Sequence, residues 1–275
     1  MNADRVPRAT RPTSKQQRLV ALAERVLERG AVPMQELADY FGVTRMTVYR
    51  DVSELEAAGV IFLRQGTAVA GASSFTETAH SFRTALNAAA KVAMCREIRG
   101  HIRPGSTVFL DDSTTVLPLV DLLAEQAPMT ILTNSQSVAA AASEHPELRL
   151  FVAGGNYRPT YASYAGETTL SVLRSLSADF CVMSSTVINE GTLYHPVEEN
   201  AAIKRVMMER SRASFLLADA SKFGQRATHE VCRADGFDLL VTTGGVTPGE
   251  LAAVGCPVVT VSLLLVAAQG AVTPH

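Results

Sequence analysis

Apolar positions in the first third of the chain repeat with a helical period. Between residues 14 and 29 they recur at intervals of three and four, which predicts an amphipathic helix that ends at Gly30. A short second helix is expected over 36–41. A third should follow Thr44, whose hydroxyl can cap it, and run to about residue 58.

Two short apolar runs follow the third helix. They cover 60–63 and 67–70 and are separated by Arg64–Gln65–Gly66, which predicts a β-hairpin. Three helices with a short turn at Gly42 and a terminal hairpin form a winged helix-turn-helix, a layout that places one helix in the DNA major groove. We therefore expect a DNA-binding domain over 14–70.

The pattern changes after residue 70. Residues 71–81 are rich in Ser, Ala and Thr and predict a linker, and a helix is expected over 82–103. Further on, short β-branched runs alternate with helical segments rich in Ala and Leu. The expected strands are 107–110, 129–133, 148–153, 180–183, 215–218, 239–243 and 258–261. The expected helices are 115–126, 136–143, 166–176, 198–213 and 248–254. This alternation predicts an α/β domain over 82–265 with a mainly parallel sheet.

The third helix carries the candidate DNA-reading side chains. Spacing places Val48, Val52 and Leu55 on its core face and leaves Arg50 on the opposite side. Its first turn contains no Asp or Glu, so its N–H groups and positive dipole end are available to phosphate. The candidates for contact with double-stranded operator DNA are Thr44, Arg45, Met46, Thr47, Tyr49, Arg50 and, in the wing, Arg64. An amphipathic surface helix with solvated arginines is the alternative interpretation.

The net charge of −2 excludes a generally nucleic-acid-coating protein. Positive charge is concentrated at the start of the chain, where only Asp4 opposes the basic side chains of Arg5, Arg8, Arg11, Lys15 and Arg18. Such an arm can contact the phosphate backbone, or it can be a solvated tail.

The four cysteines are widely spaced and form no metal-binding or disulfide pattern, and the histidines show no metal-ligand spacing. The sequence therefore predicts no metal and no cofactor. No export signal opens the chain, and the longest apolar stretch, 258–268, is too short to span a bilayer. We expect a cytoplasmic protein without a membrane partner.

The run Thr47–Val48–Tyr49–Arg50–Asp51–Val52, with Leu55 and Gly59, resembles the winged-helix signature of DeoR-type bacterial repressors, although that family usually has Arg where Tyr49 stands. The second half also resembles the family, in order, so that the resemblance covers nearly the whole chain, from about residue 14 to 262. The matching segments are Phe109–Thr115, Leu132–Ser135, Ala153–Gly155, Arg158, Gly166, Ala178–Phe180, Lys204–Met207 and Ala218–Gly224.

The resemblance implies a C-terminal domain similar to the sugar-phosphate isomerase and CoA-transferase fold, which senses a small anionic effector such as a sugar phosphate. Thr114 and Thr115 are expected at a helix N-terminus, where hydroxyls and free N–H groups can hold phosphate. Lys204 and Lys222 can neutralise it, and Asp111 can accept sugar hydroxyls. The candidate effector site comprises Asp111, Ser113, Thr114, Thr115, Thr133, Asn134, Gly154, Gly155, Arg158, Lys204 and Lys222.

Each of these residues also has a structural interpretation. The threonines can simply cap a helix, Asp111 can pair with a nearby cation, and the two lysines can be solvated charges. Several positions depart from the family pattern and indicate a remodelled or a lost effector site: Ser113, Ser184–Ser185–Thr186, Asn200 and Thr243.

Two functions remain open at this point. The first is a ligand-responsive repressor of a carbohydrate-catabolism operon, not an enzyme, acting as a homodimer or homotetramer because paired half-sites supply specificity. The second is an isomerase- or deaminase-like enzyme with an appended DNA-binding domain, which would need a carboxylate base such as Asp111, Asp112 or Glu198.

Overall fold

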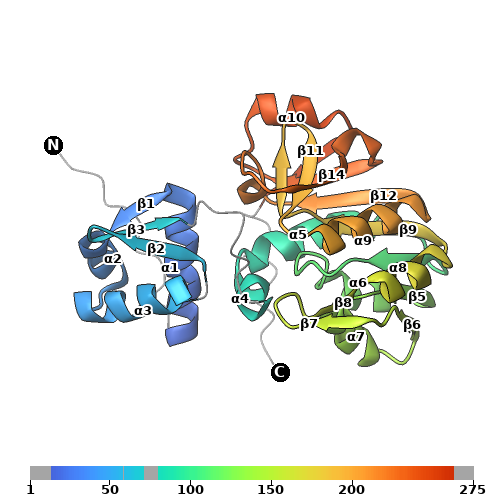
Figure 1. The fold of residues 1–275 in the computed structure, drawn as a ribbon, viewed down its shortest axis with the longest axis horizontal. Helices are drawn as coiled ribbons and strands as arrows, with labels where there is room; N and C mark the ends of the chain where they lie inside the picture. Colours follow the sequence, from blue (N-terminus) through green and yellow to red (C-terminus); the bar gives the residue numbers. More distant parts are fainter. Residues whose placement is uncertain (1–13, 58, 71–79, 263–275) are drawn as a thin grey trace, which may run out of the picture. The chain divides into compact units, whose positions relative to one another are not determined.

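The structure is a computed structural model that describes residues 14–57, 59–70 and 80–262. The chain divides into two compact units, Met1–Leu86 and Asn87–His275. Figure 1 shows the elements of both units, labelled in chain order.

The first unit is a winged helix-turn-helix. Its elements are α1 (Lys15–Arg29), β1 (Ala31–Pro33), α2 (Met34–Phe41), α3 (Arg45–Ala57), β2 (Ile61–Arg64), β3 (Thr67–Ala70) and α4 (His80–Ala85). The strands form an antiparallel sheet in the order β1-β3-β2. The three expected helices and the hairpin are confirmed. The three-residue strand β1 was not predicted, because so short a segment has no measurable period.

Local sequence fixes the ends of the first two helices. Ser14 and Gln17 form a reciprocal capping box at the start of α1. Gly42 ends α2 in the left-handed region, with φ 63°, which glycine adopts without a steric cost. The apolar faces of α1, α2 and α3 close one core that also contains Ile61 and Ala68 of the wing.

The segment that joins the two units differs from the expected linker and helix. Residues 71–79 lie outside the described residues, but α4 begins at His80, and Phe82 packs in the core of the first unit. The helix expected over 82–103 is wrong. It is divided into α4 and α5 (Ala88–Arg99) because Asn87 has a left-handed backbone, with φ 54°.

The second unit is built on a seven-stranded sheet whose paired strands are all parallel, in the order β15-β14-β12-β9-β4-β5-β6. The strands are β4 (Thr107–Leu110), β5 (Met129–Thr133), β6 (Leu148–Val152), β9 (Ala178–Ser184), β12 (Ser211–Ala218), β14 (Leu239–Thr243) and β15 (Val258–Val261). The expected α/β class with a mainly parallel sheet is confirmed.

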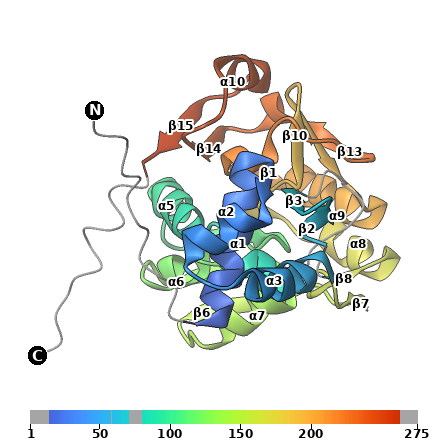
Figure 2. The same cartoon turned by 90° about the vertical axis from the view of Figure 1, so that its left-hand side faces the viewer.

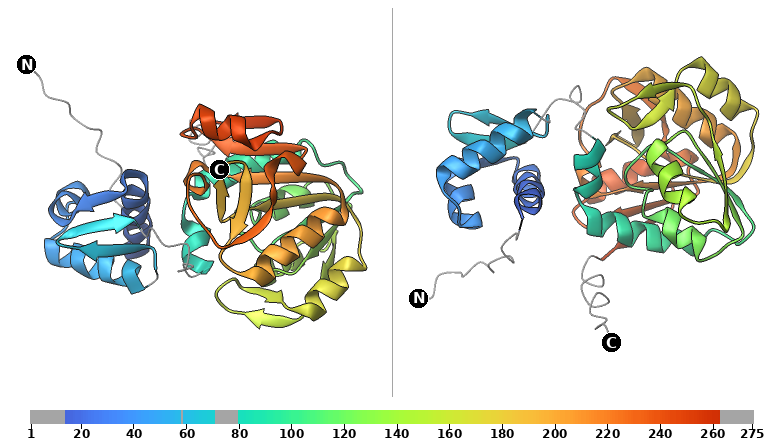
Figure 3. Two further views of the ribbon diagram at one scale, coloured as in Figure 1. Left: turned by 45° about the horizontal axis from the view of Figure 1, so that its top comes forward. Right: turned by 90° about the horizontal axis from the view of Figure 1, so that it is seen from below.

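Helices cover both faces of this sheet (Figure 3). One core contains residues of α5, α6 (Leu119–Ala124) and α7 (Gln136–Ser143). The other contains residues of α8 (Glu167–Arg174), α9 (Glu198–Glu209) and α10 (Pro248–Val254). Successive residues of β4 alternate between the cores, with Val108 and Leu110 in the first and Phe109 in the second.

Five short strands were not predicted. A hairpin, β7 (Asn156–Arg158) with β8 (Ser163–Ala165), connects β6 to α8, and its second strand lies beside α8 and α9 (Figure 2). A small antiparallel sheet contains β10 (Val187–Asn189), β11 (Thr192–His195) and β13 (His229–Arg233). Short 3-10 turns at Ala220–Lys222 and Ala234–Gly236 complete the described unit.

The order of the strands indicates the side of the sheet at which a ligand can bind. The chain runs outward from β4 through β5 to β6, and then returns to the other side of β4 with β9, β12, β14 and β15. The order in which the chain adds strands therefore reverses between β4 and β9, although these two strands are parallel. Open α/β sheets bind ligands beyond the carboxyl ends of the strands at such a point.

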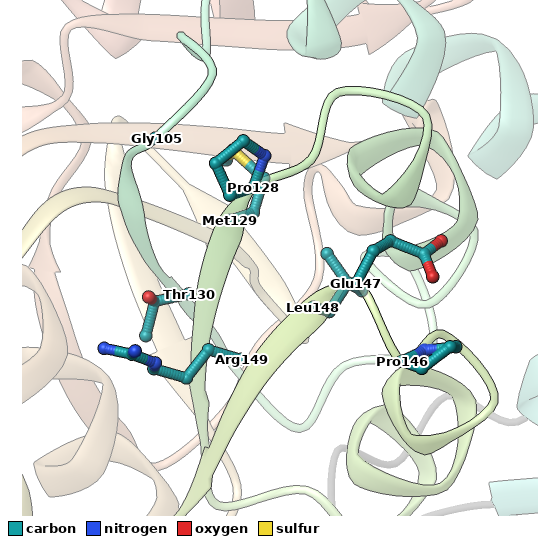
Figure 4. A pocket seen from close by; sticks show the side chains of 8 residues that line it. All are labelled: Gly105, Pro128, Met129, Thr130, Pro146, Glu147, Leu148 and Arg149. Carbon is teal, nitrogen blue, oxygen red and sulfur yellow. The ribbon is translucent and has the colours of Figure 1, made fainter.

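At the opposite side of the sheet, where the strands begin, aspartate side chains accept hydrogen bonds from the backbone. Asp179 accepts a hydrogen bond from the Thr107 N–H at 2.8 Å, and Asp238 accepts one from the Ser214 N–H at 2.8 Å. A hollow of about 550 Å³ lies at the amino ends of β5 and β6, lined by residues such as Gly105, Pro128, Glu147 and Arg149 (Figure 4). It lies away from the carboxyl ends of the strands, and we do not assign it to the effector.

Candidate functional site

The third helix presents its polar side outward, as expected. Val48, Val52 and Leu55 are buried, while Met46 is 63% exposed and Arg50 is exposed. No acidic side chain occurs in the first turn of α3. Its N-terminal turn can therefore receive a phosphate, and Arg50 is free of protein ion pairs in the described residues and can reach a base edge.

Thr44 caps this helix. Its Oγ1 accepts a hydrogen bond from the Thr47 N–H at 3.2 Å and lies 2.9 Å from the Thr47 hydroxyl. The guanidinium of Arg45 lies 6.0 Å from the centre of the Tyr49 ring, which places the two side chains on one flank of the helix. In the wing, exposed Arg64 lies 5.8 Å from the Phe62 ring.

Two members of the expected basic arm have structural partners. Arg18 forms hydrogen bonds to both carboxylate oxygens of Asp51, at 2.6 and 3.1 Å, and Lys15 pairs with Glu54 at 2.6 Å. Both pairs join α1 to α3, and contact of these two residues with phosphate stays a prediction. Arg5, Arg8 and Arg11 lie outside the described residues.

The candidate sensor site is centred on Asp111, the residue that follows β4. One of its oxygens accepts hydrogen bonds from the backbone and side chain of Ser113, at 3.0 and 2.6 Å. The other accepts from the Ser184 N–H at 3.1 Å and from the Lys204 ammonium. Lys204 also donates to the Ser184 carbonyl at 3.1 Å. These contacts join β4, β9 and α9 at the point where the strand order reverses.

Asp112 forms the second half of the same network. Its Oδ2 accepts hydrogen bonds from the Ser163 hydroxyl at 2.9 Å and from the Asn200 amide at 2.6 Å, and its Oδ1 lies 3.7 Å from the Lys204 ammonium. Both carboxylates and Lys204 are buried. Burial alone lowers the pKa of Lys204, but the carboxylates of Asp111 and Asp112 outweigh it and raise the pKa overall.

Thr114 and Thr115 do not lie at a helix N-terminus. The helix expected from residue 115 begins at Leu119, so both threonines lie in the preceding turn, and the predicted helix-end phosphate cradle is wrong. Instead, the Lys91 ammonium donates to the Thr114 hydroxyl at 3.0 Å. The Cys95 thiol, whose pKa is raised to about 12 by burial, donates to the Thr115 carbonyl at 3.2 Å.

The segments after β5 and β6 contribute structural contacts. The Thr133 hydroxyl accepts from the Ser135 N–H at 3.0 Å, and the Asn134 amide donates to the Tyr164 carbonyl at 2.8 Å. Gly155 passes so close to Thr169 that a Cβ there would collide with its hydroxyl, and that hydroxyl donates to the Gly154 carbonyl at 2.9 Å.

Arg158, in contrast, is exposed and pairs with Glu199 at 2.8 Å. The structure therefore places it on the outside of the β7–β8 hairpin, not among the buried polar side chains.

A second polar cluster lies beyond β12 and β14. Asp219 accepts hydrogen bonds from the Ser221 N–H at 2.9 Å and the Asn87 amide at 3.3 Å. Burial alone would raise the pKa of Asp219, but the charge of Lys222 and the hydrogen bonds from Ser221 lower it overall. The Thr243 hydroxyl accepts from the Ala220 N–H at 3.1 Å, so it fixes the turn that carries Lys222.

Three of the residues that depart from the family pattern thus have defined contacts. Ser113 bonds to Asp111, Asn200 to Asp112, and Thr243 to the loop after β12. Sequence reasoning did not select Lys91, Ser163 or Asp219 as site residues. Lys91 and Asp219 lie on elements that the structure brings to the carboxyl edge, but a charged residue in a predicted helix or turn carries no signal of burial by itself.

Comparison with known proteins gives the family. A model of the DeoR C-terminal sensor domain matches residues 86–243, and a model of an HTH domain matches residues 18–68. The chain belongs to the DeoR family. It is 30% identical over 224 residues to the HTH-type transcriptional regulator YgbI of Escherichia coli, covering 82% of this chain and 88% of that protein.

Two further DeoR relatives have named roles. The glycerol-3-phosphate regulon repressor of Escherichia coli is 31% identical, covering 77% of this chain and 84% of that protein. The transcriptional repressor AccR of Agrobacterium fabrum is 26% identical, covering 84% and 91%. A ribose-5-phosphate isomerase in complex with phospho-erythronic acid aligns with 49% of this chain and 53% of its own at 14% identity. The TM-score of this alignment is 0.37.

Neither a metal site nor a membrane span is found among the described residues. No group of three or more His, Cys, Asp or Glu side chains there could hold a metal ion. Within the same ranges no helix is long and apolar enough to cross a bilayer.

Proposed function

We propose that this DeoR-family protein is a repressor of carbohydrate-catabolism genes whose operator binding is controlled by a sugar phosphate. The observation that carries the effector half is the buried network of Asp111, Asp112 and Lys204 at the switch point of the parallel sheet. The exposed face of α3 supports the DNA-binding part of the proposal. Relatives named as repressors of the glycerol-3-phosphate regulon and of an aga operon support the same assignment.

The effector is expected at the carboxyl edge of the sheet. The proposed contacts are those of the sequence-based set: Asp111, Ser113, Thr114, Thr115, Thr133, Asn134, Gly154, Gly155, Arg158, Lys204 and Lys222. Lys222 is the member of this set best suited to a phosphate group, since it is partly exposed on the turn after β12. Lys204 is already neutralised by two carboxylates and is not available for that role.

An enzymatic function is less well supported. A general base needs a free lone pair that points at the substrate. Asp111 accepts hydrogen bonds from Ser113, Ser184 and Lys204, and Asp112 accepts from Ser163 and Asn200. We therefore propose that the protein binds its sugar phosphate without turnover.

Self-association is also part of the proposal, because one winged helix contacts too few base pairs to define a genomic site. The structure supplies a candidate surface at the free edge of β6, where Phe151 is 43% and Val152 37% exposed. The Ala-rich segment 88–93 is a less suitable surface, because Ala90 and Ala93 of α5 are buried.

The test is operator selection followed by titration with effectors. Genomic fragments bound by the purified protein would be sequenced, and their affinity measured with and without a panel of sugar phosphates. We expect one high-affinity operator class and at least one sugar phosphate that changes its affinity, with coupling of about 1–3 kcal/mol. Loss of a sugar phosphate to a new product at catalytic protein concentration would favour the isomerase-like alternative.

A further inference from the structure

Three buried polar atoms near the network have no hydrogen-bond partner. They are Asn134 Oδ1, Ser184 Oγ and Asn200 Oδ1, and they account for three of the five such atoms in the described residues. All three residues are at most 2% exposed. An unpaired buried polar group costs about 1–3 kcal/mol, so folded proteins leave few of them. Three at the ligand edge of one sheet indicate partners that come from outside the chain.

The orientation of the two amides is fixed by their neighbours. The Asn134 nitrogen faces the Tyr164 carbonyl, and the Asn200 nitrogen faces a carboxylate oxygen of Asp112. Both neighbours can only accept a hydrogen bond, so neither amide can exchange its nitrogen with its oxygen. What remains unsatisfied on each side chain is therefore an acceptor.

The three atoms belong to one connected group of side chains. Asn134 bonds to Tyr164, whose neighbour Ser163 donates to Asp112. Asp112 in turn accepts from Asn200. Lys204 lies one helical turn after Asn200 on α9 and donates to the Ser184 carbonyl. The three unpaired atoms thus all belong to side chains of residues connected to the Asp111–Asp112–Lys204 network.

The chemistry of this group excludes phosphate as its occupant. Two carboxylates face one ammonium, so the local charge is negative, and a phosphate dianion would be repelled. A phosphate also brings mainly acceptors, whereas the amide oxygens need donors. Sugar hydroxyls are neutral and can donate to both amide oxygens and to Ser184.

We infer that Asn134, Ser184 and Asn200 form a hydroxyl-reading subsite that determines which sugar phosphate the protein senses. The inference rests on the proposed function and adds the direction in which the effector binds. Its hydroxyl-bearing end enters the Asp112 side of the network, and its phosphate lies toward Lys222. Lys204 positions the two carboxylates and Ser184 and does not contact the phosphate.

The β7–β8 hairpin closes this subsite, since it supplies Ser163 and the Tyr164 carbonyl to the network. On its outer side it is held to α9 by the Arg158–Glu199 pair, in which the side chains are 44% and 38% exposed. Exposed pairs of this kind contribute about 0–1 kcal/mol, so the hairpin is held mainly by its inner hydrogen bonds to Asp112 and Asn134.

The test compares the full-length protein with its Ser184→Ala variant. Melting temperatures and dissociation constants would be measured with ribose 5-phosphate, glucose 6-phosphate, their 2-deoxy counterparts, glycerol 3-phosphate and inorganic phosphate. Ser184→Ala removes a hydroxyl that has no partner, so the ligand-free melting temperature should be unchanged or higher. Affinity for the tightest sugar phosphate should fall about 3- to 10-fold, the value of one hydrogen bond, while affinity for inorganic phosphate stays the same.

Ser185→Ala is the matched control. The Ser185 hydroxyl donates to the Val187 carbonyl at 2.7 Å, so this variant should melt at a lower temperature and keep the parent's affinity. If Ser184→Ala binds every sugar phosphate as the parent does, the subsite is wrong and a buried water is the occupant. If no sugar phosphate stabilises the parent at all, the proposed effector class is wrong as well, so the two failures are distinguishable.

Discussion

Arg18 on α1 and Asp51 on α3 form a two-bonded ion pair, with distances of 2.6 and 3.1 Å. The Asp51 side chain is 2% exposed, and that of Arg18 is 18% exposed. The aspartate that follows Arg50 in the DNA-reading helix therefore fixes this helix against the first one. The pair also raises the pKa of Arg18, chiefly through its hydrogen bond to Asp51.

Asp51→Ala should destabilise the DNA-binding unit by about 3 kcal/mol, because it leaves a half-buried guanidinium without its partner. Urea unfolding followed by circular dichroism would measure this. Glu54→Ala breaks the exposed Lys15–Glu54 pair on the same helix and should change stability by less than about 1 kcal/mol. Equal effects of the two substitutions would contradict the role given to Asp51.

Arg50→Ala should weaken specific operator binding by roughly 1–3 kcal/mol and relax discrimination at one base pair. The reason is that Arg50 is exposed on the face of α3 opposite the core. Arg45→Ala is expected to weaken operator and unrelated DNA alike and to lower the salt dependence. Fluorescence anisotropy with operator variants separates the two results. An Arg50→Ala protein with the parent's affinity would show that the helix is oriented differently.

Lys222→Ala should remove the response of operator binding to a sugar phosphate and leave operator affinity without effector nearly unchanged. Lys222 lies on the turn fixed by Thr243, where the phosphate end is proposed to bind. Arg226→Ala, a few residues further along the chain, is the charge-matched control. Anisotropy titrations with and without effector would measure both. A normal response in Lys222→Ala would place the phosphate elsewhere.

The lowered pKa of Asp219 predicts an acid-side loss of stability. Its folded pKa lies below the unfolded value of 3.8, so its contribution is present above that value and disappears as the pH falls through the folded pKa. Asp219→Asn should therefore cost stability at pH 7, and this cost should shrink as the pH falls below 3.8. Urea midpoints measured from pH 7 to pH 2.5 test this. A difference between the two proteins that is constant with pH would contradict it.

Phe151→Lys should yield a smaller species if the β6 edge is an interface, because a charge on an apolar edge strand opposes pairing with a second copy. Light scattering at micromolar concentration would report the mass. Arg149→Ala on the same strand changes an exposed residue without adding a charge and should leave the mass unchanged. A parent protein that is monomeric with and without operator would refute the self-association proposal.

The regular elements were predictable because their periods are long enough to recognise. The bounds of β4, β5, β14, β15, α7 and α10 agree with the expected ranges. The missed strands β7, β8, β10, β11 and β13 mix polar and apolar residues and contain no long apolar run, so they were not expected. The break at Asn87 was also missed, since a single left-handed residue leaves the apolar repeat almost undisturbed.

The site was only partly predictable for a different reason. Motifs indicated Asp111, Asn134 and Lys204, but a motif does not show that Lys204 already has two carboxylate partners. Lys91 meets Thr114 across 23 positions of sequence, and Asn200 meets Asp112 across 88. Contacts at such separations depend on strand order, which the sequence pattern alone does not determine.

Asn87 lies between the proposed effector site and the DNA-binding unit, and this position bears on how the two ligands affect each other. Its amide donates to Asp219 at the effector edge, and only Leu86 separates it from α4, whose Phe82 is part of the DNA-binding core. Asp219 is therefore connected to the DNA-binding unit by one hydrogen bond and a short stretch of backbone. Linkage is reciprocal, so operator DNA must change sugar affinity by the same factor that sugar changes operator affinity. A promoter-bound molecule and a free one in the same cell would then respond at different sugar concentrations.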